Sequence, residues 1–225
     1  MTKKTSSLIV AALVVLVLCG AALADNYKYE RTSVDDAKAA AVTLEAHDFP
    51  AQLHFAGGAV KPDETPNNES CNGYRPKESD LVVSGDAESR FHNPGSSVGV
   101  DSQVELLKTS AMAATDVKRS KRMLSVTCQV QAAKQDHVKL VSYVPMGAAR
   151  CGCPFSASFA FETKTANAKV DHLFVVTVMR KGRAEATVLT IVGKSPSDTQ
   201  GTALRDALAV QGLAVKAVAA RLPAK

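Results

Sequence analysis

The chain has 225 residues, of which 22% are charged, and a formal net charge of +5. Such a mild excess of positive charge does not indicate a nucleic-acid or membrane-surface partner. The length is sufficient for one domain with a sizeable hydrophobic core.

The first 24 residues are predicted to form a cleavable signal peptide. Lys3 and Lys4 precede an apolar run over residues 8–18. That run is shorter than the roughly 20 apolar residues that cross a bilayer, so an uncleaved anchor is the less favoured alternative. The predicted cleavage signal consists of two small residues and the first residue of the mature chain: Ala22, Ala24 and Asp25.

The leader places the mature chain outside the cytoplasm, secreted or in the cell envelope. Cys19 ends a segment that resembles a lipidation motif, but the bulky Leu18 before it argues against lipidation. The apolar-rich stretch 170–192 contains several charges, so no transmembrane segment is expected in the mature chain. Those charges are Arg180, Lys181, Arg183 and Glu185.

The mature chain is expected to begin with a flexible segment, 25–33, followed by one domain over 34–223. Ser33 is predicted to cap a helix that continues to residue 46, with Asp35 and Asp36 favourably placed in its first turn. A short strand is expected at 53–55. Residues 57–80 are rich in glycine, proline and asparagine, which predicts a long loop.

Alternating apolar residues predict strands over most of the remaining chain. In the strand at 98–106, valines and leucine alternate with Asp101, Gln103 and Glu105, which is typical of a half-buried strand. The strand at 170–180 is apolar on both faces, as in the centre of a sheet. Lys181-Gly182 predicts a two-residue hairpin. The other expected strands cover 81–91, 138–144, 155–162 and 183–192.

Two further helical segments are predicted. The first covers 110–134, as one helix or in two pieces, with one apolar face that contains Ala113, Val117, Leu124 and Cys128. Its basic run is interpreted as a solvated surface, with an anionic partner as the alternative. That run consists of Lys118, Arg119, Lys121 and Arg122. The second helix covers 199–222, with an apolar stripe formed by Leu204, Leu208, Val215, Val218 and Leu222.

The order of these elements predicts an α+β fold, an antiparallel sheet flanked by helices. Four cysteines remain after the leader is removed: Cys71, Cys128, Cys151 and Cys153. In an exported protein this number indicates two disulfides, and the residues leave all three connectivities open.

The layout resembles the PsbP-like fold and, more loosely, the extracellular sensor domains of bacterial receptor kinases. It is also similar to a group of uncharacterised exported bacterial proteins. Four stretches carry the resemblance: Cys71-Asn72-Gly73-Tyr74-Arg75-Pro76-Lys77-Glu78-Ser79-Asp80-Leu81 with the following Gly85-Asp86-Ala87-Glu88-Ser89, the helix that reaches Cys128, Arg180-Lys181-Gly182-Arg183-Ala184, and Ala219-Ala220-Arg221-Leu222. The resemblance implies a disulfide between Cys71 and Cys128, no catalytic residues, and a role in binding or sensing.

We therefore expect a non-enzymatic, sensor-like domain that binds a ligand or a protein in the cell envelope. No cofactor loop, serine-nucleophile signature or metal-ligand spacing is found, and the five histidines are dispersed. The alternative is a thiol–disulfide redox protein that uses Cys151-Gly152-Cys153. A disulfide across one residue is strained, and Arg150 beside it favours a thiolate. A structural envelope protein without a small ligand is a third possibility.

Overall fold

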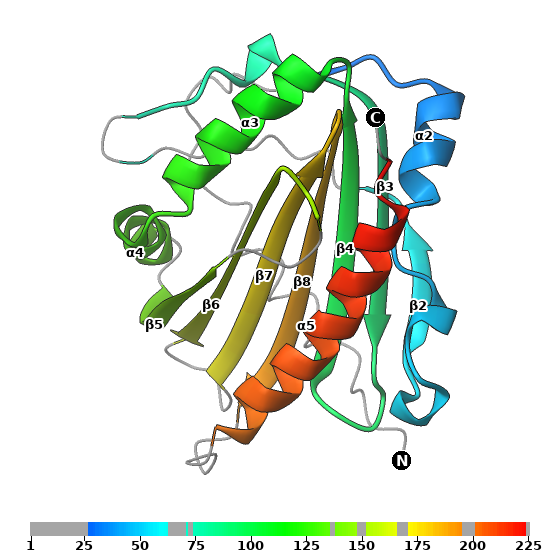
Figure 1. Ribbon diagram of the computed structural model, residues 1–225. Coiled ribbons are helices and arrows are strands. Elements are labelled where there is room, and N and C mark those ends of the chain that lie inside the picture. Colours follow the sequence, from blue (N-terminus) through cyan, green and yellow to red (C-terminus); the bar gives the residue numbers. More distant parts are fainter. Residues whose placement is uncertain are drawn as a thin grey trace, which may run out of the picture.

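The computed structural model describes residues 27–62, 71, 74–135, 138–147, 152–165, 171–194 and 201–223. Within these residues, eight strands form one sheet in the order β1-β3-β4-β8-β7-β6-β5, and β2 also pairs with β3 (Figure 1). All pairs are antiparallel except β1 with β3. The strands are β1 (Lys28–Tyr29), β2 (Ala56–Val60), β3 (Val82–His92), β4 (Val98–Leu107), β5 (Val138–Gly147), β6 (Phe155–Thr165), β7 (Asp171–Lys181) and β8 (Ala184–Lys194).

Helices flank this sheet, so the predicted α+β class is correct. The helices are α2 (Ser33–Ala40), α3 (Ser110–Met123), α4 (Val126–Gln135) and α5 (Thr202–Arg221). Three short 3-10 turns cover Ala46–Asp48, Ala51–Leu53 and Glu78–Asp80. No helix among the described residues has both the length and the apolar character needed to cross a membrane.

The larger core lies between the sheet and α5, which runs along the strands in Figure 1. Val210, Ala214 and Val218 of α5 belong to the same buried cluster as Val104 and Val188 of the sheet. Residues of α2 and the segment after it, including Ala39 and Leu44, extend this cluster.

A buried glutamine also links α5 to the sheet. Gln211 Nε2 donates to Thr177 Oγ1 (2.9 Å) and to the Val188 carbonyl (3.0 Å), while its Oε1 accepts from Thr190 Oγ1 (2.5 Å). Because a buried amide is costly unless its groups are paired, these three bonds favour one position of the helix over the sheet.

The first helix differs from its prediction at both ends. Thr32, not Ser33, is the N-cap, and its side chain accepts a hydrogen bond from the Asp35 amide. The helix ends at Ala40 instead of residue 46, because the chain turns there and carries Val42 and Leu44 into the core. The prediction of a strand at 53–55 is also wrong. A 3-10 turn and left-handed His54 occupy that region, and β2 takes the first residues of the predicted loop.

The C-terminal half differs in smaller ways. The hairpin turn is Gly182-Arg183, one residue later than predicted, and Gly182 has a positive φ of 63°. β5 continues through Pro145, which an edge strand tolerates. The described part of α5 begins at Thr202 with Gly201 as its N-cap. The buried face of α5 consists largely of alanines, whereas Leu204 is exposed, so only Val218 and Leu222 of the predicted stripe are fully buried.

Candidate functional site

The register of the sheet aligns three carboxylic side chains across neighbouring strands. Asp86 of β3 pairs with Glu105 of β4, and Glu105 pairs with Glu185 of β8. Paired residues of neighbouring strands project from the same face, about 5 Å apart. We call these three residues the acidic row. The same line continues through Arg180 of β7 to Phe155 of β6.

Helix α3 crosses the sheet directly above this line. Near its start, Ala113 belongs to a buried cluster with Leu81, Val83 and Leu107. One turn later, Asp116 faces Glu185 in hydrogen-bond contact. Further along, Lys121 Nζ lies 4.5 Å from the centroid of the Phe155 ring. In Figure 1, α3 runs obliquely to the strands, beside their upper ends.

The face beneath α3 is opposite the face that packs on α5. Glu185 faces α3, whereas Val188 belongs to the cluster that contains α5. Because successive side chains of a strand alternate between faces, residues three positions apart project to opposite sides. α3 and α5 therefore cover different faces of the sheet, and the acidic row is separated from the larger core.

The environment of the row opposes ionisation of its carboxyl groups. Burial raises the pKa of Glu105 well above its usual value, and the nearby Asp86, Asp116 and Glu78 raise it further. Burial likewise raises the pKa of Glu185, with Asp116 and Glu105 as the next causes. Both shifts favour the protonated form of these carboxyl groups, and carboxyl groups with raised pKa values are typical of functional sites.

Asp116 links the row to the N-terminal strand. Its Oδ1 accepts a hydrogen bond from the Tyr27 hydroxyl (3.0 Å). Burial raises the pKa of Asp116, while Tyr27 and Arg119 oppose that shift. Because Asp116 and Glu185 are in hydrogen-bond contact, one proton between the two carboxyl groups satisfies both.

Several polar side chains near the row are only half-buried. Asp86 and Asp116 are fully buried, whereas Glu105 and Glu185 keep part of their surface accessible. The next line of the sheet adds half-buried side chains on the same face, Gln103 and Thr187, which pair with each other. Part of the surface of Glu105, Glu185 and these two neighbours is therefore accessible beside α3.

Buried polar atoms that make no geometric hydrogen bond in this region include Oε2 of Glu185 and Nε of Arg180. Unsatisfied buried polar atoms are rare in folded proteins, because each costs about 1–3 kcal/mol.

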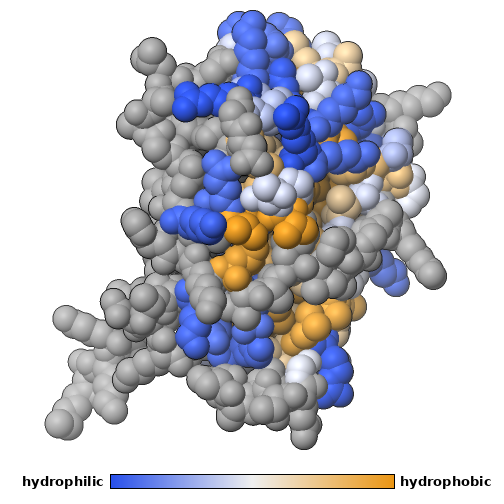
Figure 2. Space-filling view, turned by 90° about the vertical axis from the view of Figure 1, so that its left-hand side faces the viewer, coloured by the Kyte–Doolittle hydropathy of each residue, from blue (hydrophilic) through white to orange (hydrophobic). Residues whose placement is uncertain are grey.

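The other half of the same face is aromatic and aliphatic. Phe161 and Phe174 stack with ring centroids 4.8 Å apart in a buried cluster on β6, β7 and β8. Partly buried hydrophobic side chains pack at its margin: Leu124, Leu140 and Phe155. Figure 2 shows hydrophobic atoms gathered in the middle of the side that carries α3 and α4, between hydrophilic residues. The face thus combines a carboxyl-lined half with an apolar half.

A second charged group lies farther down β3 and β4. Arg90 Nε donates to the buried Glu88 (2.6 Å) and lies 3.9 Å from Asp101 Oδ2. Burial raises the pKa of Asp101 to about 7, although Arg90 opposes the shift. Asp101 is therefore a carboxyl group that titrates near neutral pH in the native protein.

We expect the protein to lose stability as pH rises from about 4 to about 7. The native state keeps the Asp101 proton in this window, whereas the unfolded chain releases it near pH 3.9. Above pH 7 both states are ionised and the loss is complete. Asp101→Asn should therefore be more stable than the wild type at pH 8 by about 1–3 kcal/mol, with no gain below pH 4. Urea unfolding at both pH values measures this.

Asp206→Asn is the matched control for that measurement, because Asp206 is an exposed carboxylate on α5. It should leave the pH profile unchanged. Equal profiles for Asp101→Asn and the wild type would contradict the assignment.

The predicted basic run of α3 has three different environments. Arg119 is largely buried, donates to the Lys77 carbonyl, and lies 3.5 Å from Glu78 Oε2. Arg122 stacks 3.9 Å from the centroid of Tyr74. Lys118 is exposed, as expected of a solvated surface. The prediction of a solvated surface is therefore wrong for Arg119. Its side chain helps to hold the segment before β3.

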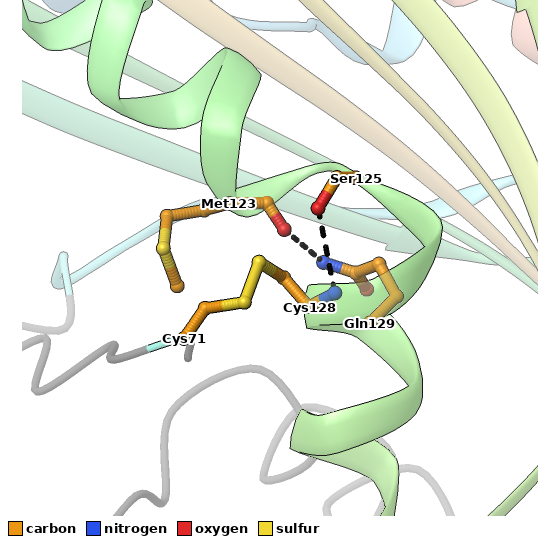
Figure 3. Close-up of a disulfide and its surroundings, with 5 residues drawn as sticks. All are labelled: Cys71, Met123, Ser125, Cys128 and Gln129. Carbon is orange, nitrogen blue, oxygen red and sulfur yellow. Dashed lines mark hydrogen bonds between the residues drawn. A yellow bond between two sulfur atoms is a disulfide. The ribbon is translucent and has the colours of Figure 1, made fainter. Parts of the chain in front are cut away.

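Among the predicted site residues, Cys71 and Cys128 are joined by a disulfide with their Cα atoms 5.2 Å apart (Figure 3). This is the pairing that the family resemblance implies. Both cysteines are buried with Met123, and Tyr74 packs against them. Cys128 lies in the first turn of α4, where its amide donates to Ser125 Oγ (3.4 Å).

The remaining predicted site residues are only partly described. Cys153 also belongs to a disulfide. Neither Cys71 nor Cys128 is its partner, because those two bond to each other. Cys153 is half-buried and packs against the larger core. Cys19, Cys151 and the predicted cleavage signal Ala22, Ala24 and Asp25 lie outside the described residues.

The described residues contain no group of three or more His, Cys, Asp or Glu suited to a metal ion. Sequence reasoning missed the acidic row, although it placed Glu105 on the polar face of a strand. The available signal was the charged residues inside otherwise apolar strands, Asp86 and Glu185. Their alignment depends on the register of β3, β4 and β8, which the sequence does not state.

No protein-family model and no curated protein sequence matches the chain.

Proposed function

We propose that the chain is an exported, non-enzymatic, sensor-like domain that binds a ligand on the sheet face beneath α3. The observation that carries this proposal is a pair of half-buried carboxyl groups, Glu105 and Glu185, on the same sheet face as an apolar cluster. Small-molecule sites usually combine apolar walls with a few convergent polar groups. The predicted leader and the Cys71–Cys128 disulfide favour an extracytoplasmic location.

The geometry favours binding over catalysis. Burial and the neighbouring carboxyl groups raise the pKa values of Glu105 and Glu185 and so favour their protonated forms. Protonated carboxyl groups can donate and accept hydrogen bonds, so the row can orient a ligand without a chemical step.

The test is to add a bulky side chain to the sheet face beside α3. The full chain is purified from the envelope of the expressing cells, incubated with a small-molecule extract of that envelope, and analysed by native mass spectrometry. We expect a retained small molecule with the wild type. Thr187→Trp, which places a large side chain next to Gln103, should reduce retention at least tenfold.

Ala220→Trp on the exposed side of α5 is the matched control and should retain the ligand. Circular dichroism verifies that both variants are folded. A folded wild type that retains no small molecule would overturn the proposal, as would equal retention by Thr187→Trp.

The thiol–disulfide alternative rests on Cys153, which already belongs to a disulfide. Its half-buried position against the core limits the access that a redox partner needs. The reduction potential of this disulfide separates the two functions. A value below about −300 mV would mark the bond as structural.

A further inference from the structure

We propose that the open edge of β2 pairs with the same strand of a second copy of this chain, so that the sheets of two copies join into one. This interface goes beyond the proposed ligand site and contains no residue of the acidic row. It follows from the outer side of β2, from the composition of that strand and from exposed apolar side chains along the same edge.

The outer side of β2 pairs with no other described strand. Within the described residues β2 pairs with β3 alone, and Figure 1 shows it at the margin of the sheet, on the far side from β5. Four of its five residues are exposed, and the fifth, Gly58, is half-buried. The backbone groups of alternate residues in a strand point to opposite sides. β2 therefore presents N–H and C=O groups that another strand can bind.

The two edges of the sheet differ in how they are protected. β5 contains Pro145, which has no N–H, and its pairing with β6 shifts register twice. Prolines and bulges are devices that keep an edge strand from pairing with another chain. β2 has the sequence Ala-Gly-Gly-Ala-Val, without a proline or a charge, and its register with β3 is regular. Lys61 and Pro62 follow directly, so the segment open to pairing is limited to these five residues.

The sequence of β2 is compatible with itself in antiparallel pairing. A twofold axis at Gly58 places this glycine opposite its own counterpart and Ala56 opposite Val60 of the other copy, so every position meets an uncharged residue. Lys61 lies six positions along the strand from its counterpart, which is about 20 Å and beyond the screening length of about 8–10 Å. Like charges are therefore kept apart. Twofold dimers that use one patch on both copies are the commonest assemblies.

The edge beside β2 is also apolar. β1 and β2 pair with the two ends of β3, and α2 begins between them, where Asp36 binds the Asp86 amide. Five large hydrophobic side chains are exposed among the described residues, and three of them lie on these elements: Tyr29 of β1, Val34 of α2 and Val60 of β2. Exposed apolar surface of this kind favours association. The interface can therefore extend past the end of β2.

Sedimentation velocity of the full chain over a wide range of concentration tests the proposal. We expect a reversible dimer of the wild type. Gly58→Asp and Gly58→Lys should each weaken it by about fivefold or more, because like charges then lie directly opposite each other. An equal mixture of the two variants should dimerise at least as well as the wild type, with the heterodimer identified by its mass in native mass spectrometry.

Gly212→Asp is the matched control. It adds the same charge at an exposed glycine of α5 and should dimerise like the wild type. No atom lies within 4 Å of a Cβ added at Gly58 or at Gly212, so these variants should fold, which circular dichroism verifies. Hydrogen exchange of the wild type needs no variant: the amides of β2 should become more protected as concentration rises, whereas those of β5 should not.

Several results would overturn the proposal. They are a wild type that stays monomeric at every concentration, a dimer that Gly58→Asp leaves intact, and a mixture of the two charged variants that forms no heterodimer. A bound polypeptide of a different mass in place of the second copy would assign the edge to another protein and would also overturn it. Retention of a small molecule in the extract experiment depends on none of these results, so the ligand site and the interface are tested separately.

Discussion

Gly85→Ala is expected to destabilise the fold by about 3 kcal/mol or more. A Cβ atom at this position would lie 2.4 Å from the carbonyl carbon of Asp35 and 2.5 Å from its oxygen. Both atoms belong to the backbone of α2, so no side-chain rotation relieves the overlap. Either α2 must move away from the sheet or β3 must bend at Gly85, where its pairing with β4 already shifts register.

Movement of α2 would break the ion pairs that hold it. Arg183 Nη2 of the β7–β8 hairpin lies 2.6 Å from Asp35 Oδ1, and this bond is the main cause that lowers the pKa of Asp35. Asp36 Oδ1 accepts from the amide of Asp86, the first residue of the acidic row. The clash at Gly85 should therefore disturb both the ion pair at the turn of the hairpin and the hydrogen bond to Asp86 of the acidic row.

Gly58→Ala on β2 is the matched control, because no atom lies within 4 Å of the added Cβ. Urea unfolding should give a normal midpoint for Gly58→Ala and a strongly lowered one for Gly85→Ala. Near-equal midpoints for Gly85→Ala and the wild type would show that α2 is not held against β3 as described.

The strands were predictable where one physical signal dominated. β4 alternates buried valines with half-buried polar residues, and its pattern alone gives its bounds to within one residue. β7 is apolar on both faces, and it is indeed a central strand with β6 and β8 on either side. The face of α3 and α4 that contains Ala113, Val117 and Cys128 is buried as its helical spacing predicts.

The helices α2 and α5 were less predictable because their contacts depend on tertiary packing. Helical propensity continues past Ala40, but the burial of Val42 and Leu44 overrides it. In α5, Ala203, Ala207 and Ala214 face the sheet, since small side chains let the helix approach closely. A search for large apolar residues selects Leu204 instead, which lies on the exposed side.

The sequence pattern did not predict the acidic row for a related reason. A carboxylate that alternates with apolar residues normally marks the solvated face of an antiparallel strand. Here α3 crosses that face, so the same pattern places Glu105 and Glu185 under a helix. Which face α3 covers is decided by contacts distant in sequence, such as Asp116 with Glu185 and Ala113 with Leu81.

Removal of the disulfide, by replacing Cys71 and Cys128 with alanine, is expected to cost about 4 kcal/mol of stability. The two cysteines are 57 positions apart, and closing a loop of that length restricts the unfolded chain by this amount in the chain-entropy model. Each single variant should lose nearly as much as the double variant, because the bond needs both sulfur atoms. Urea unfolding of the three variants measures the loss.

The disulfide also bears on the site, because it fixes the segment that leads to Arg119. Cys71 is tied to Tyr74 by two backbone hydrogen bonds, and Arg122 of α3 stacks on Tyr74. A few residues later the Lys77 carbonyl accepts from Arg119. Loss of the disulfide should therefore loosen α3 above the acidic row, and hydrogen exchange should rise in α3 before it rises in α5. Uniform exchange in both helices, or a loss of stability below 1 kcal/mol, would show that α3 is held by its contacts with the sheet alone.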